Sequence, residues 1–381
     1  MRTVNIAGIG LTRFNLYDGE KGRPYREYYE LGEQAILEAL EDSGMEWKNI
    51  EAAYCGNVQG GSATGHMSAK GIGQTGIPIV NVENACSSGA SALRLAYMMI
   101  GAGVYDVVLA CGVEKLPKGM LKSQGWAVWE KVLGFNVMPA MYALETGRYM
   151  KECGATEEDF ARVTVKNRKN GALNPLARFQ KQVTIEDVLK SRLISNPLRL
   201  LNSCPLGDGG AAVILCSDNK LKNKNKKVQV ASAVLSSGTY GYEYGNRSIN
   251  VQATNIVKKS SKEAYESAGV GPEDIDVVQA YDTMSPAEIW GIEELGLCKK
   301  GEAVGLLRDG CFEIDGKLPV NTDGGLMARS HPLGATGLAQ IIEICKQLRN
   351  EAGKRQVPNA KTGIAHTMGI GLNSSVVILK R

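Results

Sequence analysis

Stretches of strand-type and helix-type hydrophobic pattern alternate along the chain. Residues 4–8 form a short apolar run typical of a buried strand. An amphipathic helical pattern over 31–42 follows and leads into a second apolar run. The same order returns after 228, with a helical pattern over 255–267. This alternation of strands and helices predicts an α/β protein.

Two distant parts of the sequence resemble each other. Residues 86–93 (CSSGASAL) parallel residues 331–338 (HPLGATGL), and residues 211–215 (AAVIL) parallel residues 375–379 (SVVIL). Such similarity predicts two related α/β halves in tandem. The predicted boundaries are an N-terminal half at 1–219, a Lys/Asn-rich linker at 220–227 and a C-terminal half at 228–381.

One long segment of the first half, about 116–202, has no counterpart in the second half. Its pattern is mostly helical, and it contains Trp126, Trp129 and several methionines and tyrosines. These apolar side chains could pack in a core or between subunits. Alternatively, they could belong to a lid that covers a substrate. The pattern leaves both interpretations open.

Composition narrows the class of protein. The chain has 381 residues, of which 44% are hydrophobic and 22% charged, as in ordinary globular proteins. The net charge of +4 is too mild to predict a nucleic-acid partner, and no apolar run is long enough to predict a membrane span. The nine cysteines include no CxxC pair, so we expect no metal site and reduced thiols in a cytoplasmic protein.

Cys86 is the first candidate for chemistry. An extended segment over 78–82 leads into a helix of small residues that starts at this cysteine. A thiol at a helix N-terminus faces unpaired N–H groups and the positive end of the helix dipole, both of which favour the nucleophilic thiolate. A structural core thiol is the alternative.

His331 occupies the equivalent position in the second half, and it is one of only three histidines, with His66 and His366. Two related halves packed about a pseudo-twofold axis would bring their equivalent helix starts together, and Cys86 beside His331. A neutral imidazole there can take the thiol proton or polarise a carbonyl. The alternative is a structural histidine at a helix start. His66 is expected in a loop.

Two further segments are candidates. His366 precedes a Gly-rich turn that includes Gly369, whose backbone N–H groups can bind an anion. Tyr281 and Asp282 end a predicted strand, a common place for site residues in α/β folds. His366 is either an acid/base group or structural, and Asp282 either lines the site or caps the helix that begins at Ser285.

At these residues the sequence resembles the thiolase superfamily over essentially its whole length. Asn84-Ala-Cys86-Ser-Ser-Gly89 is similar to the family's nucleophile motif, and His331-Pro-Leu-Gly334-Ala-Thr-Gly337 is similar to its His-Pro-x-Gly-x-Thr-Gly motif. Residues 196–201 and 204–212 resemble the end of the family's insertion and the strand after it. His366 stands where other thiolases carry a second cysteine, which is typical of the sterol-carrier-protein and archaeal type.

The resemblance implies a five-layered αβαβα fold of two duplicated halves with a helical loop-domain insertion. It also implies acyl transfer between a 3-oxoacyl-CoA and coenzyme A through an acyl-Cys86 intermediate. His331 would activate Cys86, His366 would be the second acid/base group, and the backbone N–H groups of Cys86 and Gly369 would form an oxyanion hole.

Ligands and partners are also implied by the resemblance. Coenzyme A would be a substrate, with no covalently bound cofactor. The assembly would have a homodimer core and could include a small zinc-ribbon/OB-fold protein. The residues expected to contact the substrate or coenzyme A are Arg168, Asn174, Gly337 and Met368. For Lys166 and Lys169, on either side of Arg168, a solvated helix face is at least as good an interpretation.

One departure from the family pattern bears on the substrate. The subgroup usually has His-Asp-Cys-Phe where this chain has Tyr281-Asp282-Thr283-Met284. We therefore expect an unusual acyl group, such as the aromatic dicarboxylic benzoylsuccinyl-CoA. Two alternatives are a retro-aldol lyase of the same fold that uses Tyr281, and a non-catalytic acyl-CoA-binding protein.

Overall fold

The two halves of the chain repeat one strand-pairing pattern. The computed structural model describes residues 1–117, 119, 128–134, 136–238, 249–370 and 373–381. The first half contains β1 (Val4–Leu11), α1 (Tyr28–Ser43), β2 (Ala52–Gly56), α2 (Thr64–Ala69), β3 (Ile79–Val82), α3 (Ser88–Gly101), β4 (Val107–Glu114) and β7 (Gly209–Ser217). The second contains β8 (Gln229–Ser237), α8 (Ile249–Ala268), β9 (Val277–Gln279), α9 (Ser285–Glu294), α10 (Ala303–Arg308), α11 (Gly325–Arg329), α12 (Leu333–Arg349), β10 (Thr362–Gly369) and β11 (Asn373–Lys380).

In the first half, β7 pairs antiparallel with β1 and β4, and β2 pairs parallel with β4 and β3. In the second half, β11 pairs antiparallel with β8 and β10, and β9 pairs parallel with β10. A parallel bridge from Val278 to Val320 stands where the first half has β3. The pairing confirms the predicted duplication, while the boundaries at 219 and 228 stay a prediction.

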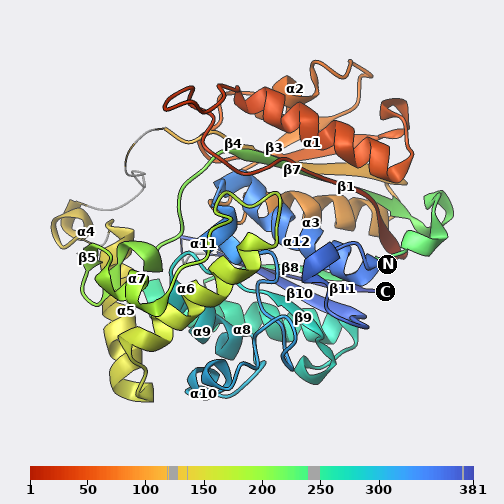
Figure 1. Ribbon diagram of the computed structural model, residues 1–381. Helices are drawn as coiled ribbons and strands as arrows, with labels where there is room; N and C mark the ends of the chain where they lie inside the picture. Colours follow the sequence, from red (N-terminus) through yellow and green to blue (C-terminus); the bar gives the residue numbers. More distant parts are fainter. Residues whose placement is uncertain (118, 120–127, 135, 239–248, 371–372) are drawn as a thin grey trace.

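The strands form one sheet in the order β3-β2-β4-β7-β1-β8-β11-β10-β9, and the halves meet at the pair Asn5–Gln229. The half-sheets lie on either side of α3 and α12, with α1 and α2 outside one and α8 and α9 outside the other (Figure 1). This succession of five layers, helix, sheet, helix, sheet, helix, is the expected fold.

The burial pattern explains these layers. Every residue of β1, β4 and β7 is buried, which is why these strands read as continuous apolar runs rather than as alternation. Of the 17 residues of α12, only Lys346 is not buried, as expected for a helix enclosed on all sides. His66, expected in a loop, lies on α2, a short helix with a buried side.

Small residues let α3 and α12 cross at close range. A Cβ atom on Gly89 would lie 2.5 Å from the carbonyl oxygen of Gly334, and one on Gly112 would lie 2.2 Å from the same oxygen. Only glycine permits such backbone contact. The two helix starts, and the residues just before them, are therefore held together at the centre of the molecule.

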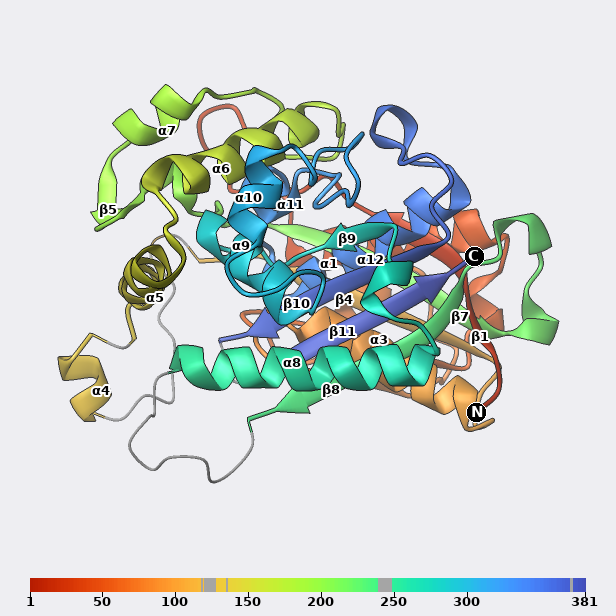
Figure 2. The same cartoon turned by 90° about the horizontal axis from the view of Figure 1, so that it is seen from below.

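The insertion is mostly helical, as predicted, and lies to one side of the layers (Figure 2). Its elements are α4 (Val128–Val132), α5 (Met138–Cys153), α6 (Glu157–Ala172), α7 (Ile185–Lys190), β5 (Leu193–Ser195) and β6 (Leu198–Arg199). Trp126 lies outside the described residues. No helix in the described parts of the chain is both long and apolar enough to cross a membrane.

Candidate active site

Cys86 lies between β3 and α3, directly before Ser87, the N-cap of α3. Ala85 has a φ of 50°, a left-handed conformation that turns the chain sharply from strand to helix. The Ser88 hydroxyl donates a hydrogen bond of 2.6 Å to the Ala85 carbonyl oxygen and fixes this turn. Cys86 is partly accessible, whereas Ser87 and Ser88 are buried. The thiol therefore stands at a helix start, as the sequence predicted.

His331 stands directly before Pro332, the N-cap of α12, and is buried. Its Nδ1 lies 2.7 Å from the Thr336 hydroxyl oxygen, and that hydroxyl donates its proton to the Pro332 carbonyl oxygen at 2.9 Å. Since the hydroxyl proton is already committed, Thr336 must accept a proton from Nδ1. This network assigns the neutral tautomer that leaves a lone pair on Nε2.

Tyr281 links the thiol and the imidazole. Its hydroxyl lies 3.3 Å from Nε2 of His331, and the two rings meet edge to face. The same hydroxyl hydrogen-bonds to Cys86. The structure thus brings together Cys86, Tyr281 and His331, with the phenol between the other two.

His366 adds a second buried imidazole. It lies on β10 with its ring 6.4 Å from that of Tyr281. In the described parts of the chain, neither of its ring nitrogens has a hydrogen-bond partner. A buried polar group without a partner is rare in proteins and points to a ligand or a water molecule.

Burial dominates the electrostatics of these groups. It lowers the pKa of His331 to about 3 and that of His366 to about 4, so both imidazoles are neutral at pH 7. Burial, with the charge of Glu114 opposing ionisation, raises the pKa of Cys86 to about 11. Hydrogen bonds from backbone N–H groups lower the pKa of Cys86, in the expected direction, but burial outweighs them. The thiol needs a base to ionise, and two neutral imidazoles lie nearby.

Asp282, next to Tyr281, belongs to a buried polar network. It accepts hydrogen bonds from the backbone N–H groups of Leu326 (2.8 Å) and Met327 (3.3 Å), so it caps α11 rather than the helix that begins at Ser285. Asn167 of α6 donates to it at 2.9 Å. The network ties the insertion to the segment that leads into His331.

Arg168 and Lys169 of α6 are at least partly exposed, whereas Lys166 is buried and pairs with Glu288 at 3.0 Å. The solvated-face interpretation is therefore wrong for Lys166. Arg168 stacks on Phe179, with its guanidinium carbon 4.2 Å from the ring centroid.

Three residues predicted to contact a ligand are buried. Asn174 donates to the Asp323 carbonyl oxygen at 3.0 Å and accepts from the Leu176 N–H at 3.0 Å. A Cβ atom on Gly337 would lie 2.9 Å from Ala90 of α3, so this glycine serves the helix crossing. Met368 packs in the core of the second half beside Tyr281.

Three neighbours of the site were not among the predicted site residues. Tyr142 of α5 is partly exposed, accepts a hydrogen bond of 2.9 Å from the Thr283 hydroxyl, and stacks on Trp290. Cys204 packs with Cys86 against the same core, and its N–H donates to the Thr283 carbonyl oxygen at 2.9 Å. Glu114, at the end of β4, is the third of these neighbours. Only their tertiary contacts reveal them.

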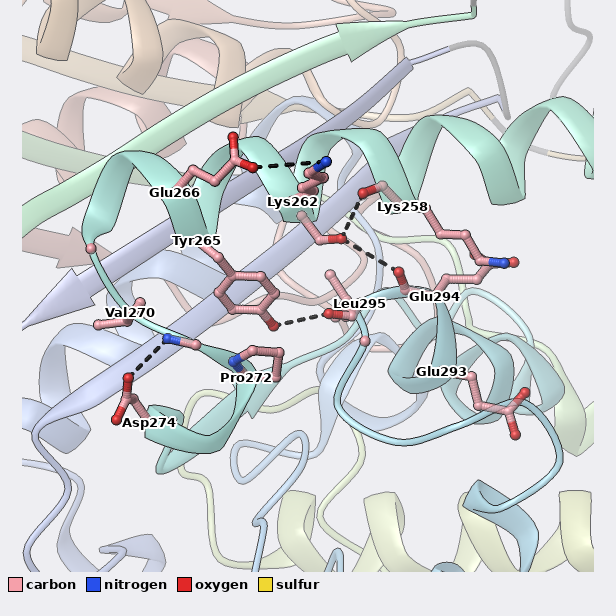
Figure 3. Close-up of a pocket in the computed structure, with 14 residues that line it drawn as sticks. Lys258, Lys262, Tyr265, Glu266, Val270, Pro272, Asp274, Glu293, Glu294 and Leu295 are labelled. Carbon is pink, nitrogen blue, oxygen red and sulfur yellow. Dashed lines mark hydrogen bonds and ion pairs between the residues drawn. The ribbon is translucent and has the colours of Figure 1, made fainter.

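A surface hollow of about 690 Å³ lies between the end of α8 and the end of α9 (Figure 3). Tyr265 donates to the Leu295 carbonyl oxygen there at 2.9 Å, and Lys262 pairs with Glu266 at 3.9 Å. Its lining includes no cysteine or histidine. The hollow therefore offers neither a thiol nor an imidazole, in contrast to the surroundings of Cys86.

Comparison with known proteins agrees with this geometry. The family model "Thiolase, N-terminal domain" matches residues 6–219, and "Thiolase C-terminal domain-like" matches residues 244–381. The chain is 38% identical to the benzoylsuccinyl-CoA thiolase subunit BbsB of Thauera aromatica over 97% of this chain and 95% of that protein. It is also 38% identical to an acetyl-CoA acetyltransferase of Methanothermobacter thermautotrophicus over the full length of both. The solved Ltp2-ChsH2(DUF35) aldolase superposes with a TM-score of 0.86 at 28% identity, covering 99% of this chain and 97% of that chain.

Proposed function

Since the chain belongs to the thiolase family and is an acyltransferase, we propose that it cleaves or forms a 3-oxoacyl-CoA through an acyl-Cys86 intermediate. The observation that carries this proposal is the position of the Tyr281 hydroxyl. It hydrogen-bonds to Cys86, and its oxygen lies 3.3 Å from Nε2 of His331, the nitrogen that keeps a free lone pair. Together the three side chains form a path for the thiol proton.

The first step relays two protons and then forms one carbon–sulfur bond. The Cys86 proton passes to the Tyr281 oxygen while the Tyr281 proton passes to Nε2 of His331. The thiolate then attacks the β-keto carbon of the substrate. As the carbon–carbon bond breaks, its electron pair forms an enolate, which takes a proton from an imidazolium to give the shorter acyl-CoA. The sulfur of free coenzyme A then attacks the acyl-Cys86 thioester, the bond between the acyl carbon and the Cys86 sulfur breaks, and the proton of the coenzyme A thiol passes to Cys86.

Two backbone groups are the proposed oxyanion donors, the N–H of Cys86 and that of Gly369. Gly369 ends β10, and the N–H of the next residue, Ile370, hydrogen-bonds to Cys86. Donors preorganised at such a position are each worth a factor of about 10²–10³ in rate for acyl transfer. His366, with two unpartnered nitrogens in the described structure, is the proposed second acid/base group.

Arg168 is the proposed contact for the phosphates of coenzyme A. Arg178 faces the same ring, with its guanidinium carbon 5.0 Å from the Phe179 centroid, so two cations flank one aromatic surface. Burial and the charge of Arg178 lower the pKa of Arg168, a repulsion that an anionic ligand would relieve. For Asn174, Gly337 and Met368 we propose that they shape the site through their contacts within the protein.

The proposed substrate is a bulky acyl group, such as the aromatic dicarboxylic benzoylsuccinyl-CoA. Tyr142 and Thr283 add hydroxyl groups beside the site, and the stack of Tyr142 on Trp290 has a centroid distance of 6.1 Å. Similarity to a benzoylsuccinyl-CoA thiolase subunit supports the same class. Turnover of a panel of oxoacyl-CoA esters, from acetoacetyl-CoA to aromatic dicarboxylic esters, tests it.

The assembly that we propose is based on an edge strand of the sheet and on the names of two similar proteins. β3 is an edge strand, and its Val80 is 47% exposed, so we propose that two copies pair through it. One relative is named as a subunit, and the name of the structural neighbour joins Ltp2 to ChsH2(DUF35), which supports a second, small partner protein. All nine cysteines are free, which supports a cytoplasmic location.

Intact-mass analysis after incubation with a 3-oxoacyl-CoA tests the central proposal. Wild-type protein should gain one acyl group on the peptide that contains Cys86. Cys86→Ala should gain none and lose turnover, whereas Cys345→Ala, a buried thiol within α12, should behave as wild type. The structural similarity to an aldolase and the presence of Tyr281 favour a retro-aldol lyase as second candidate. A Cys86→Ala protein with full activity would establish that candidate instead.

A further inference from the structure

Glu114 ends β4 and is completely buried, with a relative exposure of 0%. In the part of the chain that the structure describes, no lysine, arginine or histidine forms an ion pair with it. A buried carboxylate without a cation is unfavourable unless several hydrogen bonds stabilise it. Hydrogen bonds must therefore stabilise the Glu114 carboxylate.

Three backbone N–H groups surround this carboxylate. Val58 and Gln59, in the turn after β2, donate at 3.0 and 2.8 Å, and Gly334, in the first turn of α12, donates at 3.0 Å. One side chain thus joins the end of β4, the turn after β2 and the start of α12. A negative group at a helix start also satisfies a free N–H and the helix dipole.

The start of α12 is the place where the two halves of the active site meet. A Cβ atom on Gly334 would lie 2.6 Å from the Gly56 carbonyl oxygen, and its own carbonyl oxygen contacts Gly89 of α3. His331 precedes Gly334 by one turn, and Cys86 precedes Gly89 by the same interval. A shift of α12 along its axis would therefore move His331 relative to Cys86.

We propose that Glu114 is a positioning residue for acyl transfer: its carboxylate fixes the start of α12, and with it His331, against the start of α3 and Cys86. The inference rests on the proposed role of Cys86 as nucleophile. Glu114 itself touches neither the proposed substrate nor the proposed proton path.

The charge of Glu114 adds a second effect. Its field opposes ionisation of Cys86 and also of Cys55 on β2. Asp208, before β7, is the other charged group that acts on Glu114, and burial raises the pKa of Glu114 itself to about 7. Because Glu114 is ionised wherever the thiol titrates, removing its charge must shift Cys86 ionisation to lower pH.

Two variants separate position from charge. Glu114→Asp keeps the charge but shortens the reach by one methylene, whereas Glu114→Gln keeps the shape but removes the charge. Glu343→Gln is the control for loss of a buried carboxylate. Glu343 lies on α12, about 13 Å further along the helix than Gly334, and pairs with Arg355 at 2.9 Å, so its loss should cost stability but leave the start of α12 in place. Each protein is assayed for the rate of Cys86 acylation by a 3-oxoacyl-CoA. The pH dependence of Cys86 alkylation by iodoacetamide is measured separately and needs no turnover.

Glu114→Asp should lower the acylation rate about 10- to 100-fold, the loss typical of a misplaced catalytic group, with an unchanged alkylation profile. Glu114→Gln should lower the rate and also shift the alkylation profile to lower pH. Glu343→Gln should change neither. Wild-type acylation rates in both Glu114 variants would overturn the proposal, and if Glu114→Gln does not fold, the rate of Glu114→Asp decides alone. If Cys86 of the wild-type protein is never acylated, the proposed thiolase mechanism is refuted instead. The alkylation of Cys86 by iodoacetamide would still measure the effect of the Glu114 charge.

Discussion

Tyr281 shows how one side chain can set the chemistry of a site. Its hydroxyl stands between a thiol whose pKa is raised to about 11 and an imidazole whose pKa is lowered to about 3. Neither group is ionised by itself at pH 7, because burial favours the neutral form of both. In the proposed mechanism, charge separation therefore depends on proton transfer through the phenol at the moment of attack.

Tyr281→Phe should lower the rate of Cys86 acylation about 10- to 100-fold, since it removes a proton-transfer group but keeps the ring. Single-turnover mass spectrometry measures this rate. Tyr265→Phe is the matched control, because Tyr265 is a buried tyrosine whose hydroxyl bonds to a backbone oxygen, at 2.9 Å from Leu295. It should lose about 1 kcal/mol of stability and no activity. Equal rates in Tyr281→Phe and wild type would reduce Tyr281 to packing.

His366 makes folding stability depend on pH. Its folded pKa of about 4 lies below the ordinary value of about 6.5, so between these values the unfolded chain binds the extra proton. Relative to a His366→Asn variant, wild type should lose about 1.4 kcal/mol of unfolding free energy per pH unit as pH falls from 6.5 towards 4.

Urea denaturation of both proteins at pH 7.5, 6 and 5 measures this difference. Taking the difference matters, because Glu114 and Asp282 have pKa values raised to about 7 and stabilise the fold as pH falls through the same range. Those contributions are common to both proteins. Parallel curves for the two would show that His366 is not buried as a neutral group.

At the scale of elements, the crossing of α3 and α12 determines where the site forms. Gly89→Ala should destabilise the protein by about 1–3 kcal/mol, since the new methyl group would overlap the Gly334 carbonyl. Gly147→Ala in α5 is the control. Among the described residues, no atom beyond its chain neighbours and its own helix backbone lies within 4 Å of the added Cβ, so alanine should stabilise that helix by about 0.5–1 kcal/mol. Thermal unfolding of both variants checks the contrast, and a Gly89→Ala protein as stable as wild type would argue against tight packing.

The insertion depends on a buried ion pair. Lys166→Met should cost about 3–5 kcal/mol, because it leaves Glu288 buried without its cation. Lys169→Met, in the same helix, removes an exposed pair with Glu313 at 2.9 Å and should cost less than about 1 kcal/mol. Chemical denaturation measures both. The double variant Lys166→Met/Glu288→Gln should recover part of the loss, and failure to do so would contradict the pairing.

Local pattern and internal repetition were enough to predict Cys86 and His331 and their meeting point, because each lies at the start of a helix in equivalent positions of the two halves. The same reasoning failed for Lys166, since a lysine in a helical pattern reads as exposed unless its distant partner is known. Glu114 was missed for a related reason. Its partners are backbone groups from two other elements, and backbone groups leave no mark in the sequence.

At the scale of the whole molecule, β3 is an edge of the sheet, and Val80 on it is 47% exposed. Wild type should sediment as a dimer, and Val80→Asp should weaken it, because a charge at a strand edge opposes pairing with another strand. Val104→Asp, at a residue 59% exposed that follows α3, is the control and should leave the dimer intact. Analytical ultracentrifugation distinguishes these outcomes, and an unaffected Val80→Asp dimer would place the interface elsewhere.

The thiol and the imidazole come from opposite halves of the chain, and this division sets an order of events during synthesis. The ribosome releases Cys86 long before it releases His331, and α12 packs against α3 only after both have emerged. A nascent chain halted before residue 331 therefore carries an ordinary, unassisted cysteine. Under the proposed mechanism, reactivity towards thioesters begins only once His331 has emerged and α12 has packed against α3, which protects shorter nascent chains from acylation.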